Sequence, residues 1–255
     1  MYNRWYGINE VGAMKVLKKY LLLLFVLFMC VGCGNREEKL IMVTEASFAP
    51  YEYYSDGKVV GVDVDIAREI ALEMGKKLVV KDVAFDSIIH EVKSGKADIG
   101  VAGISYSEER AKQVDFSVNY TSSRQIVLVR EDSLISSIKE IDKKKIAVQL
   151  GSVADLYVSD EYDAKNIVRQ KKYLAAIQDL KDGKVDCVVM DELPAKQIMK
   201  QNSGIRMLNE ALVEDNYGII VNKGNTELLS IVNRVIERLK REGKIDEYVL
   251  KHSEV

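Results

Sequence analysis

The phrase IIHEVKSGKADIGVAG at residues 88–103 returns in altered form as AAIQDLKDGKVDCVVMD at residues 175–191. Each copy is a helix-forming stretch, then Gly-Lys-x-Asp, then a short apolar run that is typical of a buried strand. Gly95 and Gly183 stand where a helix ends and a positive φ is favoured. Two such units predict an α/β protein with two lobes of similar build.

Polar residues follow the strand in both copies. The first strand ends at Gly103 and leads to Ser105 and Arg110, while the second ends at Asp191. Ligands of open α/β sheets bind beyond the carboxyl ends of the strands. The pattern therefore predicts a small molecule held between the two lobes.

Composition narrows the function classes. The chain has 255 residues, 47% of them hydrophobic and 30% charged, and a net charge of −2. No basic cluster occurs outside the N-terminus, so nucleic acid is not expected as a partner. His90 and His252 are the only histidines, which disfavours a metal site or a catalytic triad. We expect His90 on an exposed helix face and His252 in a frayed tail, and no cofactor.

The N-terminus is typical of an export signal. Three lysines precede an apolar run at residues 21–31, which is too short to span a bilayer but suits a signal peptide. Small residues before Cys33 resemble a bacterial lipobox, although Cys30 stands where leucine is usual. We expect a lipoprotein signal peptide over residues 1–33, a diacylglycerol anchor on Cys33 and a tether over residues 34–38. An ordinary core cysteine is the alternative for Cys33, and Cys187 is interpreted as a core residue.

Hydrophobic periodicity assigns the rest of the chain to two lobes. Strands are expected at residues 40–43, 78–83, 99–102, 126–129, 145–148, 167–170, 185–190 and 217–221. Helices are expected at residues 65–74, 87–93, 134–141, 173–181, 193–200, 226–241 and 245–250. Lobe 1 would comprise residues 39–129 and 217–255, and lobe 2 residues 130–216. Two chain crossings between rigid lobes would form a hinge.

Each candidate binding residue also has a purely structural interpretation. Arg110 suits a carboxylate held by two parallel hydrogen bonds, or it pairs with surface acids. Asp191 suits an ammonium group, or it caps the following helix. Ser152 offers N–H groups at a helix N-terminus, or it is simply a cap. Aromatic side chains at Phe48 and Phe85 would hold an aliphatic or cationic group, or pack in the core.

Five segments of this chain resemble a known family in sequence and in order. They are VTEASFAPYEYYSDGKVVGVDVDIAREIALEMG, FDSIIHEVKSGKADIGVAGISYSEERAKQVDFS, IAVQLGS, GKVDCVVMDELPA and YGIIVNKGN. The chain is similar to family 3 of the bacterial extracellular solute-binding proteins, the polar amino-acid receptors of ABC importers. The resemblance implies a two-lobed, type II periplasmic-binding-protein-like α/β fold over residues 40–252.

The resemblance also implies a role for each candidate. Arg110 would clamp the ligand α-carboxylate, with the backbone N–H groups of Ser105 and Ser152. Asp191 and the Gly103 carbonyl would hold the α-ammonium group. Phe48 and Phe85 would stack around the side chain, and Glu45 would meet its far end. Gln149, Leu150 and Met190 lie at positions that leave the exact ligand open.

The expected function is capture of a polar L-amino acid outside the plasma membrane, on the periplasmic side if the host is Gram-negative. The acidic Glu45 favours Lys, Arg or ornithine, with Gln, His or cystine as alternatives. Expected partners are ABC permease subunits and the membrane, through the lipid anchor, and the protein is expected to be a monomer. The alternative from another class is a cyclohexadienyl or arogenate dehydratase-like enzyme on the same fold, which would need a carboxylic acid to protonate a leaving hydroxyl.

Overall fold

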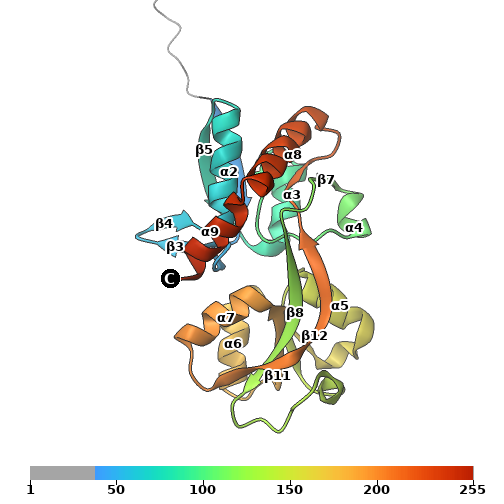
Figure 1. The fold of residues 1–255 in the computed structure, drawn as a ribbon. Coiled ribbons are helices and arrows are strands. Elements are labelled where there is room, and N and C mark those ends of the chain that lie inside the picture. Colours follow the sequence, from blue (N-terminus) through green and yellow to red (C-terminus); the bar gives the residue numbers. More distant parts are fainter. Residues whose placement is uncertain (1–37, 255) are drawn as a thin grey trace, which may run out of the picture. The chain divides into compact units, whose positions relative to one another are not determined.

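A computed structural model describes residues 38–254 of the chain. These residues fold into two α/β lobes (Figure 1), as the repeated phrase predicts. The first-lobe elements are β1 (Lys39–Thr44), β2 (Ser47–Phe48), β3 (Glu52–Ser55), β4 (Lys58–Val60), α2 (Val62–Glu73), β5 (Lys77–Asp82), η1 (Phe85–Ser87), α3 (Ile88–Lys93), β6 (Ile99–Gly100), α4 (Glu108–Ala111), β7 (Val114–Phe116), β13 (Ile220–Asn222), α8 (Thr226–Arg241) and α9 (Lys244–Ser253). The second-lobe elements are β8 (Thr121–Arg130), η2 (Ile138–Ile141), β9 (Ile146–Gln149), α5 (Val153–Glu161), η3 (Ala164–Asn166), β10 (Ile167–Gln170), α6 (Tyr173–Lys181), β11 (Cys187–Asp191), α7 (Glu192–Gln201) and β12 (Ile205–Tyr217).

The two main sheets share one topology. The first has the order β5-β1-β6-β13-β7 and the second β10-β9-β11-β8-β12. In each sheet three neighbouring strands are parallel, and the fourth runs antiparallel to both of its neighbours. The fourth strand lies next to a chain crossing in both lobes (Figure 1). A third, three-stranded sheet of β2, β3 and β4 belongs to the first lobe.

The repeated phrase forms the same local structure twice. Gly95 and Gly183 adopt φ values of 72° and 71° after α3 and α6. The Asp98 carboxylate then accepts a hydrogen bond from the Ile41 N–H at 2.7 Å, and Asp186 accepts one from the Lys145 N–H at 2.8 Å. Each aspartate thus ties its unit to the start of the neighbouring strand. This shared bond explains why Asp recurs three residues after the glycine.

The first crossing between the lobes lies earlier than the predicted boundary at residue 130. Strand β8 pairs with β11 and β12 along its length, so residues 121–130 belong to the second sheet. The crossings are therefore residues 117–120 and 218–219, which lie side by side because the Tyr120 N–H donates to the Tyr217 carbonyl at 3.0 Å. The antiparallel pairing of β8 with β12, which no local pattern reveals, moves the boundary.

Three other expectations differ from the structure. Residues 134–137 are irregular, and only η2 forms in the helix predicted at 134–141, where Leu134 is 96% exposed. The strand β12 was not predicted, since its sequence carries many charged residues. His252 is buried in α9, where it contacts the Asp65 carboxylate and the Tyr53 hydroxyl, and it is not part of a frayed tail.

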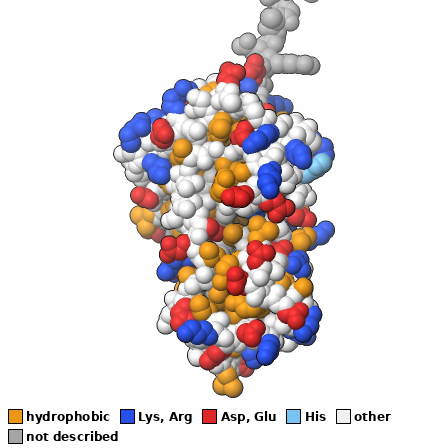
Figure 2. Space-filling model, turned by 90° about the vertical axis from the view of Figure 1, so that its right-hand side faces the viewer, with side chains coloured by type: hydrophobic (Ala, Val, Ile, Leu, Met, Phe, Trp, Pro, Cys, Tyr) orange, Lys and Arg blue, Asp and Glu red, His pale blue; other side chains and the backbone are white. Residues whose placement is uncertain are grey.

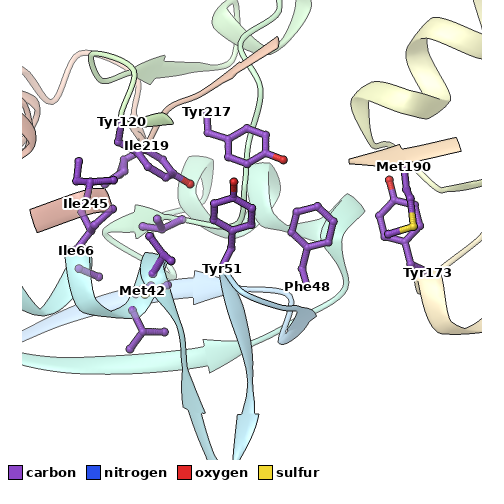
Figure 3. Close-up of a cluster of buried hydrophobic side chains, with 14 of the residues drawn as sticks. Met42, Phe48, Tyr51, Ile66, Tyr120, Tyr173, Met190, Tyr217, Ile219 and Ile245 are labelled. Carbon is purple, nitrogen blue, oxygen red and sulfur yellow. The ribbon is translucent and has the colours of Figure 1, made fainter. Parts of the chain in front are cut away.

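Apolar side chains fill both lobes and meet at the cleft. The apolar stripe of α8 is buried in the first lobe, through Leu228, Val232, Val235 and Leu239. Cys187 is a buried core residue, as expected. Figure 3 shows Phe48 and Tyr51 of the first lobe approaching Tyr173 and Met190 of the second.

The surface carries mixed charge. On the face in Figure 2, basic and acidic side chains are interspersed, without a large area of one sign. Among residues 38–254, no helix is long and apolar enough to cross a bilayer.

Candidate functional site

A narrow cavity lies between the lobes, beyond the carboxyl ends of their parallel strands. All eight predicted site residues line it, which brings together segments as distant as residues 45 and 191. The lining residues are Glu45, Phe48, Glu52, Phe85, Ala102, Gly103, Ser105, Arg110, Gln149, Ser152, Val153, Tyr173 and Asp191. The individual ligand contacts assigned to the eight residues stay predictions.

Arg110 provides the positive charge of the cavity. It lies in the short helix α4, whose N-terminus is capped by the Ser107 hydroxyl, and it is only 6% exposed. Its guanidinium donates to the Ser105 carbonyl at 2.6 Å and to the Gly151 carbonyl of the other lobe at 2.7 Å. Burial lowers the pKa of Arg110, yet a guanidinium stays charged at any physiological pH. Its buried place in the cavity contradicts the surface ion-pair alternative.

Asp191 provides the opposite charge. It is 4% exposed and directly precedes α7, but its carboxylate makes no capping bond to that helix. Instead Oδ1 accepts hydrogen bonds from the Ser123 hydroxyl at 2.7 Å, from the Gln125 amide at 2.7 Å and from the Tyr217 hydroxyl. The capping interpretation is therefore wrong, and the side chain is held in place by the hinge strands β8 and β12.

A second carboxylate lies behind Asp191. The Gln125 amide, which donates to Asp191, also donates to Asp215 Oδ2 at 3.1 Å, and the Ser105 hydroxyl donates to the same oxygen at 3.0 Å. Burial, followed by the negative charge of Asp215, raises the pKa of Asp191 to about 7. A cationic ligand group near Asp191 would relieve this repulsion.

Gly103 adopts a backbone conformation that favours glycine. Its φ is +53°, and a Cβ at this position would lie 2.9 Å from the Phe48 ring and 3.2 Å from the Tyr217 ring. Its N–H donates to the buried Asp63 carboxylate at 2.9 Å, and the Tyr120 hydroxyl donates to the same side chain. The Asp63 carboxylate thus fixes the end of this strand and the start of the loop that leads to Ser105.

Ser152 caps α5, because its hydroxyl accepts the Asp155 N–H at 3.1 Å. Its own N–H donates to the Gln149 carbonyl at 3.1 Å. The structural interpretation of Ser152 is therefore confirmed, although the residue also lines the cavity. A ligand carboxylate that accepts from the Ser152 N–H would have to share this donor with the Gln149 carbonyl.

Glu45 also lines the cavity and is 1% exposed. It already has protein partners: the Ser47 hydroxyl at 2.8 Å, the Lys172 ammonium at 3.2 Å and the Gln149 amide at 3.4 Å. Lys172 and Gln149 come from the second lobe, so these contacts join the lobes. Glu45 is therefore not a solvated surface acid.

The aromatic contacts differ from the expected pair. Phe48 stacks on Tyr173 of the opposite lobe, with ring centroids 5.7 Å apart and planes 22° from parallel (Figure 3). Phe85 instead lies under the Arg110 guanidinium, 5.8 Å from ring centroid to Cζ. Phe85 therefore supports the cation of the cavity, and Tyr173 occupies the place opposite Phe48.

Sequence reasoning missed Glu52, Tyr173 and the Asp215–Gln125 pair. The sequence predicts only that a helix begins at Tyr173. The signal for a cleft residue was its position just after the strand at residues 167–170, because ligands bind beyond strand ends. Asp215 and Gln125 lie on strands that face each other only after folding. Within residues 38–254, no group of three or more His, Cys, Asp or Glu side chains is arranged to hold a metal ion.

Comparison with known sequences agrees with this geometry. The family model of bacterial extracellular solute-binding proteins, family 3, matches residues 40–254. The arginine-binding extracellular protein ArtP of Bacillus subtilis is 29% identical over 245 residues, which cover 90% of this chain and 96% of ArtP. The resemblance read from the five sequence segments is thereby confirmed.

Solved structures show the same two-lobed fold. The substrate-binding protein AbpA of an amino acid ABC transporter from Streptococcus pneumoniae, bound to L-arginine, superimposes with a TM-score of 0.81 at 31% identity, covering 85% of this chain and 94% of AbpA. An ancestral arginine-binding protein, solved with arginine and with glutamine, is 38% identical and has TM-scores of 0.78 and 0.79. The aligned region covers 84% of this chain and 97% of the ancestral protein. The predicted type II periplasmic-binding-protein-like fold is confirmed.

Proposed function

Because the chain belongs to family 3 of the bacterial extracellular solute-binding proteins, we propose that it captures an L-amino acid for an ABC importer. One observation carries the proposal: a buried guanidinium and a buried carboxylate, Arg110 and Asp191, line one cavity between two lobes. An α-amino acid has the complementary pair of charges. Arg110 would bind its carboxylate with parallel hydrogen bonds, and Asp191 would bind its ammonium group.

The side chain of the ligand is proposed to be cationic, with L-arginine favoured. Glu45 is a buried acid that lines the cavity, and ArtP, AbpA and the ancestral protein are described as arginine-binding or arginine-bound. The same ancestral protein was also solved with glutamine, so an amide side chain is the neighbouring possibility. Lys, ornithine, His and cystine belong in the same test.

Capture would act through closure of the two lobes around the ligand. A ligand that contacts both lobes stabilises the closed arrangement, and the permease would recognise that form. Contacts that join the lobes, Arg110 to Gly151 and Glu45 to Lys172, support this proposal, because residues proposed to bind the ligand also bridge the lobes. Family membership favours this binding role over the dehydratase-like enzyme, which would require an acid positioned on a leaving hydroxyl.

A thermal-shift panel of the common L-amino acids, ornithine and cystine tests the proposal. Ligand at about 100 times Kd should add roughly 2.7 kcal/mol to the free energy of unfolding. We expect the largest shift with L-arginine and its loss in Arg110→Ala and Asp191→Ala. A shift with neutral amino acids alone would remove the cationic preference, and no shift with any amino acid would contradict amino-acid capture.

The family is exported, and we propose that this member is held at the outer face of the plasma membrane by a diacylglycerol on Cys33. Cys33 lies outside the described residues, and the support is its lipobox-like context. In a bacterial host, Cys33→Ser should release the protein from the membrane fraction, whereas the matched Cys30→Ser should not. Membrane retention of Cys33→Ser would contradict the anchor.

A further inference from the structure

The last turn of α9, in the first lobe, contacts helix α7 of the second lobe (Figure 1). The Ser253 carbonyl accepts hydrogen bonds from the Gln197 amide at 3.0 Å and from the Lys200 ammonium at 2.5 Å. None of these three residues lines the ligand cavity. We call this contact between Gln197, Lys200 and Ser253 the α7–α9 latch, because it joins the lobes away from the ligand groups.

The acceptor of the latch is fixed within the first lobe. One ring nitrogen of the buried His252 lies 2.9 Å from the Asp65 carboxylate of α2, and the other lies 3.0 Å from the Tyr53 hydroxyl of β3. Lys251 donates to the same carboxylate at 2.8 Å. Carbonyl groups in the last turn of a helix have no partner within that helix, so the Ser253 carbonyl is available to donors from elsewhere.

The donors of the latch lie on the helix that directly follows Asp191. Gln197 is buried and Lys200 is exposed, and both side chains reach the C-terminal end of α9. A cation is favourable at that end of a helix, where the helix dipole is negative. Since α7 belongs to the second lobe and α9 to the first, a separation of the lobes on this side would break both hydrogen bonds.

The latch differs from the contacts that join the lobes at the cavity. Arg110 to Gly151 and Glu45 to Lys172 use side chains that are proposed to bind the ligand, so a bound amino acid would alter them. The latch uses none of these side chains and can stay formed while a ligand occupies the cavity. It can therefore add the same stabilisation to the closed complex whichever amino acid is held.

We propose, resting on the proposed amino-acid capture, that Gln197 and Lys200 are positioning residues that hold the lobes closed over the ligand through the Ser253 carbonyl. The latch forms as the lobes close, after the ligand has entered, so it slows release rather than entry. It raises the affinity for every ligand by one common factor, because that factor comes from the equilibrium between separated and closed lobes.

Calorimetry and stopped-flow binding of L-arginine, L-lysine and L-glutamine test the latch. Lys200→Met removes one donor, and the double variant Gln197→Met with Lys200→Met removes both at similar size. We expect the double variant to raise Kd and the dissociation rate constant about 5- to 20-fold, by the same factor for each probe that the wild type binds. The association rate constant should stay within about twofold of the wild-type value.

Lys196→Met is the matched control. It removes the same charge one turn earlier on α7, where Lys196 pairs with Glu192 of the same helix at 2.7 Å. We expect this variant to keep Kd within about twofold of the wild-type value, whereas Lys200→Met alone should raise it about two- to fivefold. An equal loss of affinity in these two variants would assign the effect to the net charge of α7 and overturn the latch.

An unchanged Kd and dissociation rate constant in a folded double variant would overturn the latch alone, because amino-acid binding by the wild type would persist. Tighter binding would also overturn it, since the contact would then favour separated lobes, as would a loss confined to one of several bound probes. If the double variant does not fold, Lys200→Met carries the same test, because its side chain is exposed. A wild-type protein that binds none of the probes would overturn the capture function and the latch together.

Discussion

At the residue scale, Lys172 of the protein competes with a cationic ligand for the Glu45 carboxylate. The Lys172 ammonium lies 3.2 Å from its carboxylate and is half exposed, so the pair is partly screened by solvent. A cationic side chain in the cavity would meet the same positive charge. Lys172 is therefore expected to weaken the binding of cations more than the binding of amides.

Replacing this lysine should sharpen the cationic preference. We expect Lys172→Met to raise the affinity for L-arginine relative to L-glutamine by roughly two- to fivefold, as for loss of an exposed ion pair. Lys171→Met is the matched control, because the Lys171 contact to Gln149 uses the backbone carbonyl alone. Calorimetry at low and high salt measures both. An equal gain in relative affinity for L-arginine in the two variants would contradict a specific effect of the Lys172–Glu45 contact and would indicate long-range charge alone.

The pKa of Asp191 predicts how binding depends on pH. Since burial and Asp215 raise it to about 7, protons compete with a ligand ammonium group below that value. We expect Kd to be nearly constant above pH 8 and to rise by up to about tenfold per pH unit well below pH 7. Titration of L-arginine between pH 5 and 8.5 measures this. A Kd that is flat across this range would contradict ammonium binding at Asp191.

The same shift makes Asp191 unfavourable for the ligand-free fold. Its folded pKa lies above the unfolded value of about 3.9, so its penalty is absent below that value and grows as pH rises toward 7. Asp191→Asn should therefore raise the free energy of unfolding at pH 7.5 by roughly 1–3 kcal/mol and abolish the ligand shift. Asp186→Asn, at a purely structural aspartate, should lower stability and keep the ligand shift.

Denaturant unfolding with and without L-arginine compares the two variants. An Asp191→Asn protein less stable than wild type at pH 7.5, or one that keeps the full ligand shift, would contradict this role for Asp191.

At the element scale, the repeated helix–turn–strand unit was readable from sequence because its signals are local. Glycine after a helix, aspartate three residues later and an apolar run all act within one unit. Strand β12 and the boundary at β8 were not readable, because their pairing is decided by a partner more than 70 residues away. The lining of the cavity followed from strand ends, whereas the partners of Glu45 and Asp191 depend on how the lobes meet.

The turn after β6 has a testable steric limit. Gly103→Ala would place a Cβ 2.9 Å from the Phe48 ring at a positive φ, so it should destabilise the fold by about 1–3 kcal/mol and weaken ligand binding at least tenfold. Gly95→Ala has a similar φ with open space around its Cβ, and it should destabilise by about 1 kcal/mol with an unchanged Kd. Chemical unfolding and calorimetry separate these effects. Equal changes in Kd for both variants would contradict the steric explanation.

At the scale of the whole molecule, two lobes of one topology are joined by two neighbouring crossings. Each lobe supplies part of the binding chemistry: Arg110, Phe48 and Glu45 from the first, and Asp191 and Tyr173 from the second. Neither lobe alone presents both Arg110 and Asp191. Binding should therefore require the two ends of the amino acid to be present together.

Calorimetric comparison of L-arginine with agmatine, which lacks the carboxylate, and N-acetyl-L-arginine, which lacks the ammonium charge, tests this claim most directly. We expect the wild type to bind L-arginine about 10- to 150-fold more tightly than either analogue, since each lost charge contact is worth about 1.5–3 kcal/mol. In Arg110→Ala, L-arginine should bind no better than agmatine does. Equal affinity of the wild type for L-arginine and agmatine would contradict recognition of an amino acid by Arg110 and Asp191.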